Sequence, residues 1–146
     1  MSLTEKTPPN QTDTLAFELE LRHPPEKVWR ALTTPELLAE WLLPVVGLRL
    51  TPGAEFTFSA PPQPGWDGQV NCQLLSIDAP RQLSYRWVVG ELDTQVTFTL
   101  EPTEEGSRLS LTQSGFAPAQ KQNFGGARYG WKLMGGKLVA LLDRVA

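Results

Sequence analysis

The chain has 146 residues, of which 40% are hydrophobic and 20% are charged; this is the composition of one globular domain and excludes a largely disordered chain. Its 13 Lys and Arg residues and 16 Asp and Glu residues give a net charge of −3 without a basic cluster, so we expect no nucleic-acid partner. With one Cys and one His, the chain can form neither an internal disulfide nor a structural zinc site.

The N-terminal segment, residues 1–13, is rich in Thr, Pro, Asn and Gln and has no periodic apolar face, so we predict a flexible tail. It also lacks the apolar stretch of a secretory signal. No apolar run in the chain reaches the roughly 20 residues that cross a bilayer, so we predict a cytoplasmic protein without membrane insertion. The folded domain is predicted to span residues 14–146.

Residues 15–22 alternate apolar and polar side chains, a period of two that predicts a half-buried first strand. Pro25 followed by Glu26 is typical of a helix start, because proline fits the first helical position and an acid suits the positive end of the dipole. Thr34, as a cap, and Pro35 repeat this arrangement. Two short helices are therefore predicted after the first strand.

The middle of the chain reads as short strands separated by Pro, Gly and Asp turns, which predicts an antiparallel meander. Adjacent Leu74 and Leu75 break the alternation and predict a bulge. Together with the first strand, the sheet is predicted to have six or seven strands. The predicted strands of the meander lie near residues 48–50, 55–59, 70–77, 83–87, 93–100 and 109–113.

The last segment, residues 119–145, changes to steps of three and four through Trp131, Met134 and Leu138, which predicts a long amphipathic helix. Gly135 and Gly136 inside this helix cost roughly 1 kcal/mol each relative to alanine. We expect them to allow a close approach of another element or a bend.

Several motifs in this order resemble a known family. They are residues 25–36, Trp41, Pro52-Gly53 with Phe56, Gly68-Gln69-Val70, residues 80–87, Val96 with its strand, residues 107–111, and Gly130-Trp131. The chain resembles the domain of activators of the ninety-kilodalton heat-shock chaperone ATPase. That domain belongs to the START-like (SRPBCC) superfamily, which includes birch-pollen-allergen-like proteins and polyketide cyclases.

The resemblance implies an α+β helix-grip fold, in which a curved antiparallel sheet wraps around the long C-terminal helix. In such a fold the sheet face toward the helix builds both the core and a pocket. Strand alternation and helical spacing then give most of the residues expected to line a pocket for a hydrophobic ligand, with Tyr85 and Gln113 as its polar anchors. Trp41 and Trp66 lie on segments that are expected to rim the opening of this pocket. The predicted pocket residues are Trp41, Phe56, Phe58, Trp66, Tyr85, Trp87, Gln113, Trp131 and Met134.

Simple core packing remains the alternative for the aromatic residues, and it is favoured for Tyr85. For the four tryptophans the two readings are balanced, because a buried indole N–H needs a partner that a ligand or a water could supply. The inward face holds no carboxylate, lysine or histidine, so we predict no catalytic residue, metal or cofactor. His23 is expected to be a capping or surface residue, and Cys72 an inert buried thiol.

Three functional hypotheses follow. The preferred one is a carrier or sensor that binds a lipid, a polyketide or an aromatic compound between helix and sheet. The second is a chaperone-activator-like interaction module with the chaperone as partner, and the third is a cyclase- or hydratase-like enzyme on the same fold. A monomer and a homodimer are both compatible with the sequence.

Overall fold

The computed structural model describes residues 3–7, 13–64 and 66–145. Eight strands and three helices lie in these residues. In chain order they are β1 (Leu3–Glu5), β2 (Thr14–Leu21), α1 (Pro25–Thr33), α2 (Pro35–Trp41), β3 (Val45–Val46), β4 (Glu55–Ser59), β5 (Gln69–Asp78), β6 (Gln82–Val89), β7 (Leu92–Pro102), β8 (Ser107–Ser114) and α3 (Lys121–Arg144).

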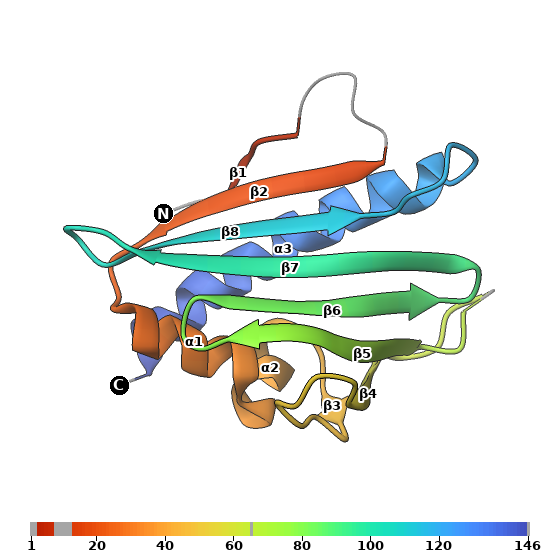
Figure 1. The fold of residues 1–146 in the computed structure, drawn as a ribbon. Coiled ribbons are helices and arrows are strands. Elements are labelled where there is room, and N and C mark those ends of the chain that lie inside the picture. Colours follow the sequence, from red (N-terminus) through yellow and green to blue (C-terminus); the bar gives the residue numbers. More distant parts are fainter. Residues whose placement is uncertain (1–2, 8–12, 65, 146) are drawn as a thin grey trace.

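All strands join one antiparallel sheet in the order β1-β2-β8-β7-β6-β5-β4-β3. From β3 to β8 each strand pairs with the next along the chain, and β2 returns to pair with the last strand, β8. In Figure 1, α3 runs across the far face of the sheet, and α1 and α2 lie at the end where β2 finishes. This arrangement confirms the predicted α+β helix-grip fold.

The sheet has eight strands where six or seven were predicted. Leu3–Glu5 forms an edge strand inside the segment predicted to be a flexible tail. Contacts with β2 and α3 hold this strand in place, and its short sequence has no alternating pattern from which it could be predicted. Residues 48–50 are not a strand; instead Val45–Val46 pairs with β4. Gly47 follows with a φ of 83°, which turns the chain before a longer strand can form.

The predicted bulge is confirmed in β5, where the pairing with β6 shifts between Leu74 and Ser76. Leu74 stays buried while Leu75 is 38% exposed. Leu75 is therefore the extra residue of the bulge, and side chains on both sides of it continue to alternate between the inward and outward faces.

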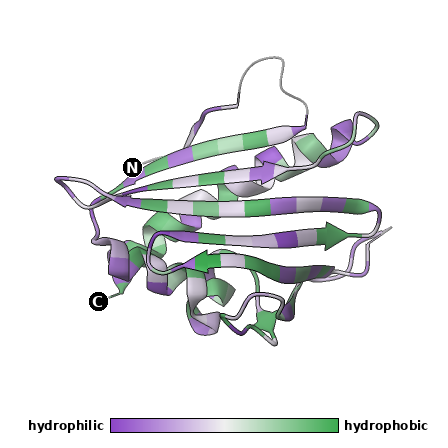
Figure 2. Ribbon diagram, in the orientation of Figure 1, coloured by the Kyte–Doolittle hydropathy of each residue, from purple (hydrophilic) through white to green (hydrophobic). Residues whose placement is uncertain are grey.

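The two short helices are confirmed, and each begins with its proline at the first helical position. Thr34 ends α1 and precedes α2, but its side chain makes no capping hydrogen bond, contrary to the sequence prediction. The helices are held by burial: α1 covers the core with Val28 and Leu32, and α2 with Leu38. In Figure 2, hydrophobic residues in green and hydrophilic residues in purple alternate along the strands of the sheet.

Helix α3 holds the edge strand β1 in two ways. A Cβ atom on Gly135 would lie 3.3 Å from Leu3 Cδ1, so this glycine allows β1 to approach closely. Glu5 accepts a hydrogen bond from Arg128 Nε at 2.9 Å and pairs with Lys132 Nζ at 3.2 Å. Burial acts to raise the pKa of Glu5, but the hydrogen bonds from these two cations and Thr7 outweigh it and lower the pKa below its usual 4.5.

No helix in the described part of the chain is both long and apolar enough to cross a membrane.

Candidate functional site

Three of the predicted pocket residues lie together under α1 and α2. Phe56 and Phe58 on β4 and Tyr85 on β6 form a cluster, with the Phe56 and Tyr85 ring centroids 5.2 Å apart in an edge-to-face arrangement. They border an apolar cavity of about 10 Å³. Its nine lining residues are Leu32, Leu38, Leu48, Leu50, Phe56, Phe58, Leu74, Leu83 and Tyr85.

The cavity is small. A water molecule needs roughly 10–15 Å³ on the same measure, so the space holds about one water and no organic ligand. Six leucines that the sequence reasoning did not assign to the site complete the wall. Leu83 could have been found there, because it shares the alternation of Tyr85 on β6. The leucines of α1, α2 and the loop before β4 could not, since their positions depend on how the helices pack.

The loop between β3 and β4 forms part of the cavity wall. Leu48 and Leu50 of this loop line the cavity, yet Leu50 is 44% exposed to solvent. The loop is irregular and is bounded by Gly47 and Gly53, both with positive φ. This part of the wall is therefore irregular and partly exposed to solvent.

Tyr85 is the polar group of this cavity. Its hydroxyl has no hydrogen-bond partner among the described residues. In the same residues, every side-chain N or O atom that is fully shielded from solvent does have a partner. The hydroxyl must therefore reach a space that a water molecule can enter. Burial raises the pKa of Tyr85 well above its usual value, with a smaller effect from Cys72, so the hydroxyl stays a neutral donor.

Cys72 lies on β5 beside this wall and is buried. Burial raises the pKa of its thiol to about 12. The cysteine is therefore protonated near neutral pH, and neither ionisable group at this end of the core carries a charge.

The remaining aromatic residues extend the cluster toward α3 without bordering the cavity. Trp87 stacks near Phe58 at 5.5 Å and near Trp131 of α3 at 5.6 Å between ring centroids. Phe98 lies between Trp131 and Trp41 at 6.2 and 6.3 Å. These contacts form a continuous aromatic layer between sheet and helices.

Gln113, predicted to be a ligand anchor, is buried and engaged within the protein. It accepts a hydrogen bond from Trp131 Nε1 at 2.7 Å and donates one to Thr94 Oγ1 at 2.9 Å. Thr94 in turn donates to the carbonyl of Trp87 at 2.9 Å. This chain of hydrogen bonds satisfies its polar groups without any ligand.

Two other tryptophans are also satisfied internally. Trp41 is 2% exposed and donates its indole N–H to the carbonyl of Ala31 at 2.8 Å. Trp66 is half-buried at the end of the loop before β5 and donates to the carbonyl of Gln69 at 2.9 Å. Met134 is half-buried beside Gly130 of the same helix. None of these three residues borders the cavity.

A larger cleft, which the sequence reasoning missed, lies where β2 ends against α3. Its volume is about 350 Å³, and it is lined by Leu21, Arg22, His23, Val139 and Asp143. His23 Nε2 lies 3.0 Å from Asp143 Oδ1, a contact across 120 residues of sequence. No local pattern connects positions that far apart, which is why His23 resembled a capping or surface residue.

The described residues contain no group of three or more His, Cys, Asp and Glu side chains that could hold a metal ion. The nine residues of the apolar cavity include no carboxylate, lysine or histidine.

Residues 22–143 match the sequence model of the family described as activator of Hsp90 ATPase homolog 1-like protein. The chain belongs to this family. The match includes all nine residues predicted for the pocket and leaves out β1. No curated protein matches the chain.

Solved structures of other proteins share this fold. Protein MLL2253 from Mesorhizobium loti is 40% identical, with a TM-score of 0.84 over 91% of this chain and 98% of that one. CalU16 from Micromonospora echinospora is 22% identical, with a TM-score of 0.75 over 98% of this chain and 85% of that one. DynU16, from the dynemicin biosynthetic locus, is also 22% identical, with a TM-score of 0.77 over 92% and 48%.

Proposed function

We propose that this protein binds a neutral, hydrophobic small molecule in the cavity under α1 and α2, and acts as a cytoplasmic carrier or sensor. The observation that carries the proposal is the Tyr85 hydroxyl, a neutral donor without a partner in the described part of the chain. The rest of the cavity wall is made of leucine and phenylalanine. Apolar walls with a few placed polar groups are the usual make-up of a small-molecule site. A lipid, a polyketide or an aromatic compound with one oxygen acceptor fits this chemistry.

Ligand entry requires the cavity to expand, since its volume is about 10 Å³. The loop of Leu48 and Leu50 is the wall that moves at least cost. Leu50 is already 44% exposed, so moving it outward adds little apolar surface to water. The same motion would cost far more at Leu74 or Leu83, which are held within paired strands.

One similar structure bears on the class of ligand. DynU16 belongs to a biosynthetic locus, which is compatible with a natural product as ligand on this fold. The wall offers no charged acid or base, so a cyclase- or hydratase-like reaction would lack a proton donor and acceptor pair there.

The test is a panel of uncharged lipids, polyketide-like aromatic compounds and steroids, read by melting temperature and by tryptophan emission. At least one compound should raise the melting temperature, because a ligand that binds only the folded state stabilises it. Tyr85→Phe should weaken the binding of that compound by up to about tenfold, which is the effect of one neutral hydrogen bond. The matched control is Tyr129→Phe, at the chain's other tyrosine, which is 71% exposed.

Two outcomes would contradict the proposal. One is a panel in which no compound changes either signal. The other is a compound that binds Tyr85→Phe and Tyr129→Phe equally well, because the hydroxyl would then play no part.

A second candidate function is stimulation of a chaperone ATPase, favoured by the description of the family to which the chain belongs. The measurement is the ATPase rate of the host's own ninety-kilodalton heat-shock chaperone with and without this protein. An unchanged rate at saturating concentration would remove this candidate.

A further inference from the structure

The cleft between β2 and α3 has the size and chemistry of a second binding site. Its volume of about 350 Å³ lies within the roughly 300–1,000 Å³ of small-molecule sites. It shares no lining residue with the apolar cavity under α1 and α2. We propose that this cleft binds a small carboxylate that carries a short hydrocarbon group.

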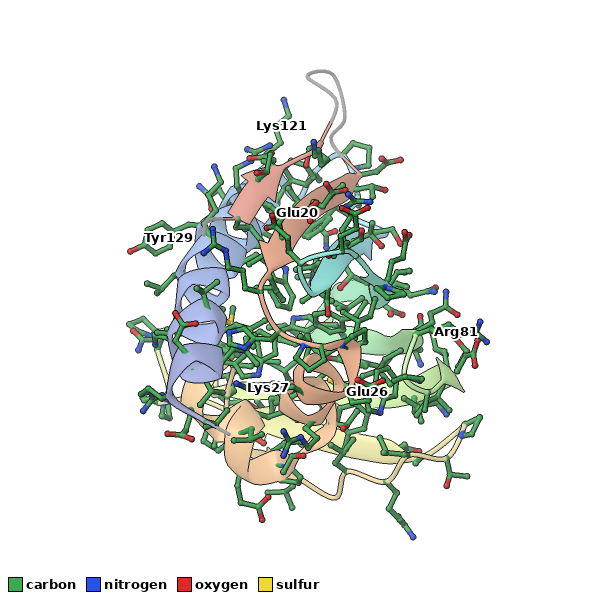
Figure 3. All side chains as sticks on the ribbon, turned by 90° about the vertical axis from the view of Figure 1, so that its left-hand side faces the viewer. Glu20, Glu26, Lys27, Arg81, Lys121 and Tyr129 are labelled. Atoms are coloured by element: carbon green, nitrogen blue, oxygen red, sulfur yellow. The ribbon has the colours of Figure 1, made fainter. Side chains whose placement is uncertain are left out.

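A chain of three side chains fixes the polar wall of the cleft. Lys27 Nζ lies 3.1 Å from His23 Nδ1, and His23 Nε2 lies 3.0 Å from Asp143 Oδ1. An ammonium group can only donate, so Nδ1 accepts, and Nε2 carries the proton that it donates to Asp143. Figure 3 shows Lys27 on the side of α1 that faces α3.

The backbone around His23 is also held in place. Ser107 is buried and donates its hydroxyl to the His23 carbonyl at 2.6 Å. A Cβ atom on Gly106 would lie 2.6 Å from the His23 nitrogen, so β8 begins in close contact with this turn. The imidazole therefore projects from a fixed backbone, as a binding site requires.

Arg22 is the group that selects an anion. It lines the cleft and has no hydrogen bond or ion pair among the described residues. By contrast, five other arginines of the described chain pair with carboxylates: Arg81, Arg86, Arg108, Arg128 and Arg144. A free guanidinium presents a planar fork of donors that matches a carboxylate.

The other walls restrict which anion fits. Leu21 and Val139 supply carbon surface, which a hydrocarbon group can cover and a bare inorganic ion cannot. Asp143 places one negative charge in the same cleft, which disfavours a dianion such as phosphate. A monoanionic carboxylate with a hydrocarbon chain satisfies both conditions.

The experiment uses the single histidine of the chain as a reporter, because its imidazole NMR signals need no assignment. Sodium hexanoate should shift these signals saturably. Hexanamide, which has the same shape without the charge, and inorganic phosphate should each bind at least about tenfold more weakly, the effect of one charged hydrogen bond. Arg22→Gln should weaken the binding of hexanoate by a similar factor. Arg49→Gln should not, since Arg49 is another exposed arginine and lies outside the cleft.

Hexanoate that fails to shift the histidine signals saturably would overturn the proposal. Equal binding to Arg22→Gln and Arg49→Gln would overturn it as well, as would equal binding of phosphate or hexanamide. Because the reporter lies in this cleft, these results do not depend on whether the apolar cavity binds a ligand. Arg22 is exposed, so its replacement leaves the core intact.

Discussion

Replacing Gln113 with leucine should destabilise the protein through its buried hydrogen-bond chain. The change removes the acceptor of Trp131 Nε1 and the donor to Thr94 Oγ1. A buried donor left without an acceptor costs about 1–3 kcal/mol, and the lost bond to Thr94 adds about 0.5–1.5 kcal/mol. We expect the free energy of unfolding to fall by about 2–4 kcal/mol. For a chain of this length, 3 kcal/mol corresponds to about 6–12 °C in melting temperature.

A double-mutant cycle with Trp131→Phe isolates the pair. Phenylalanine has no N–H, so in that background Gln113→Leu leaves no unsatisfied indole and should cost about 1–2 kcal/mol less. Urea denaturation followed by far-ultraviolet circular dichroism gives all four free energies. Gln82→Leu is the control, because Gln82 is exposed and its replacement should stay within about 0.5 kcal/mol.

Additive effects of Gln113→Leu and Trp131→Phe, within about 0.5 kcal/mol, would refute the reasoning. So would a Gln113→Leu variant as stable as the original chain. Either result would mean that the two side chains are not coupled by the hydrogen bond.

Three further predictions follow from single contacts. Cys72, whose pKa is raised to about 12, should react with a disulfide reagent at pH 8 only as fast as the protein opens, and rapidly once urea unfolds it. Gly136→Ala should raise the free energy of unfolding by about 1 kcal/mol, because the added Cβ meets no atom within 4 Å. Gly135→Ala should raise it less, because its Cβ would press on Leu3. Equal increases for the two variants would contradict this prediction. The pKa of Glu5 is lowered in the folded state, so the stability it contributes is complete above pH 4.5 and is lost as the pH falls through the lowered value. Amide exchange in β1 should accelerate over that pH range relative to amide exchange in β7. If β1 exchanges at the same rate in a Glu5→Gln variant as in the original chain, the ion pairs do not hold the strand.

The inward and outward faces of the strands could be predicted from alternation alone. Phe56, Phe58, Tyr85, Trp87 and Gln113 are all buried, as their positions in the alternation require. The bulge beside Leu74 was predicted for the same reason. These are local properties, because a strand places successive side chains on opposite faces whatever it packs against.

The composition of the candidate site was only partly predictable. Phe56, Phe58 and Tyr85 line the apolar cavity, and their binding of a ligand stays a prediction. Trp131 and Gln113, by contrast, form a hydrogen bond with each other. A sequence gives the type of a side chain and its face, but the partner of a buried polar group depends on which strand and helix positions meet. Near α3, the rings of Trp87, Phe98 and Trp131 pack against one another, and this contact depends on how the helix lies on the sheet.

The sequence by itself determined the order of the helices and of every strand except β1 and β3, the buried faces and the family, because each rests on short-range periodicity and motifs. The tertiary structure decided three other features: the attachment of β1 to α3, the small volume of the apolar cavity, and the cleft where His23 meets Asp143 across 120 residues. Each depends on contacts between segments distant in the chain. Such contacts are fixed by the close packing of the whole domain, which no local pattern encodes.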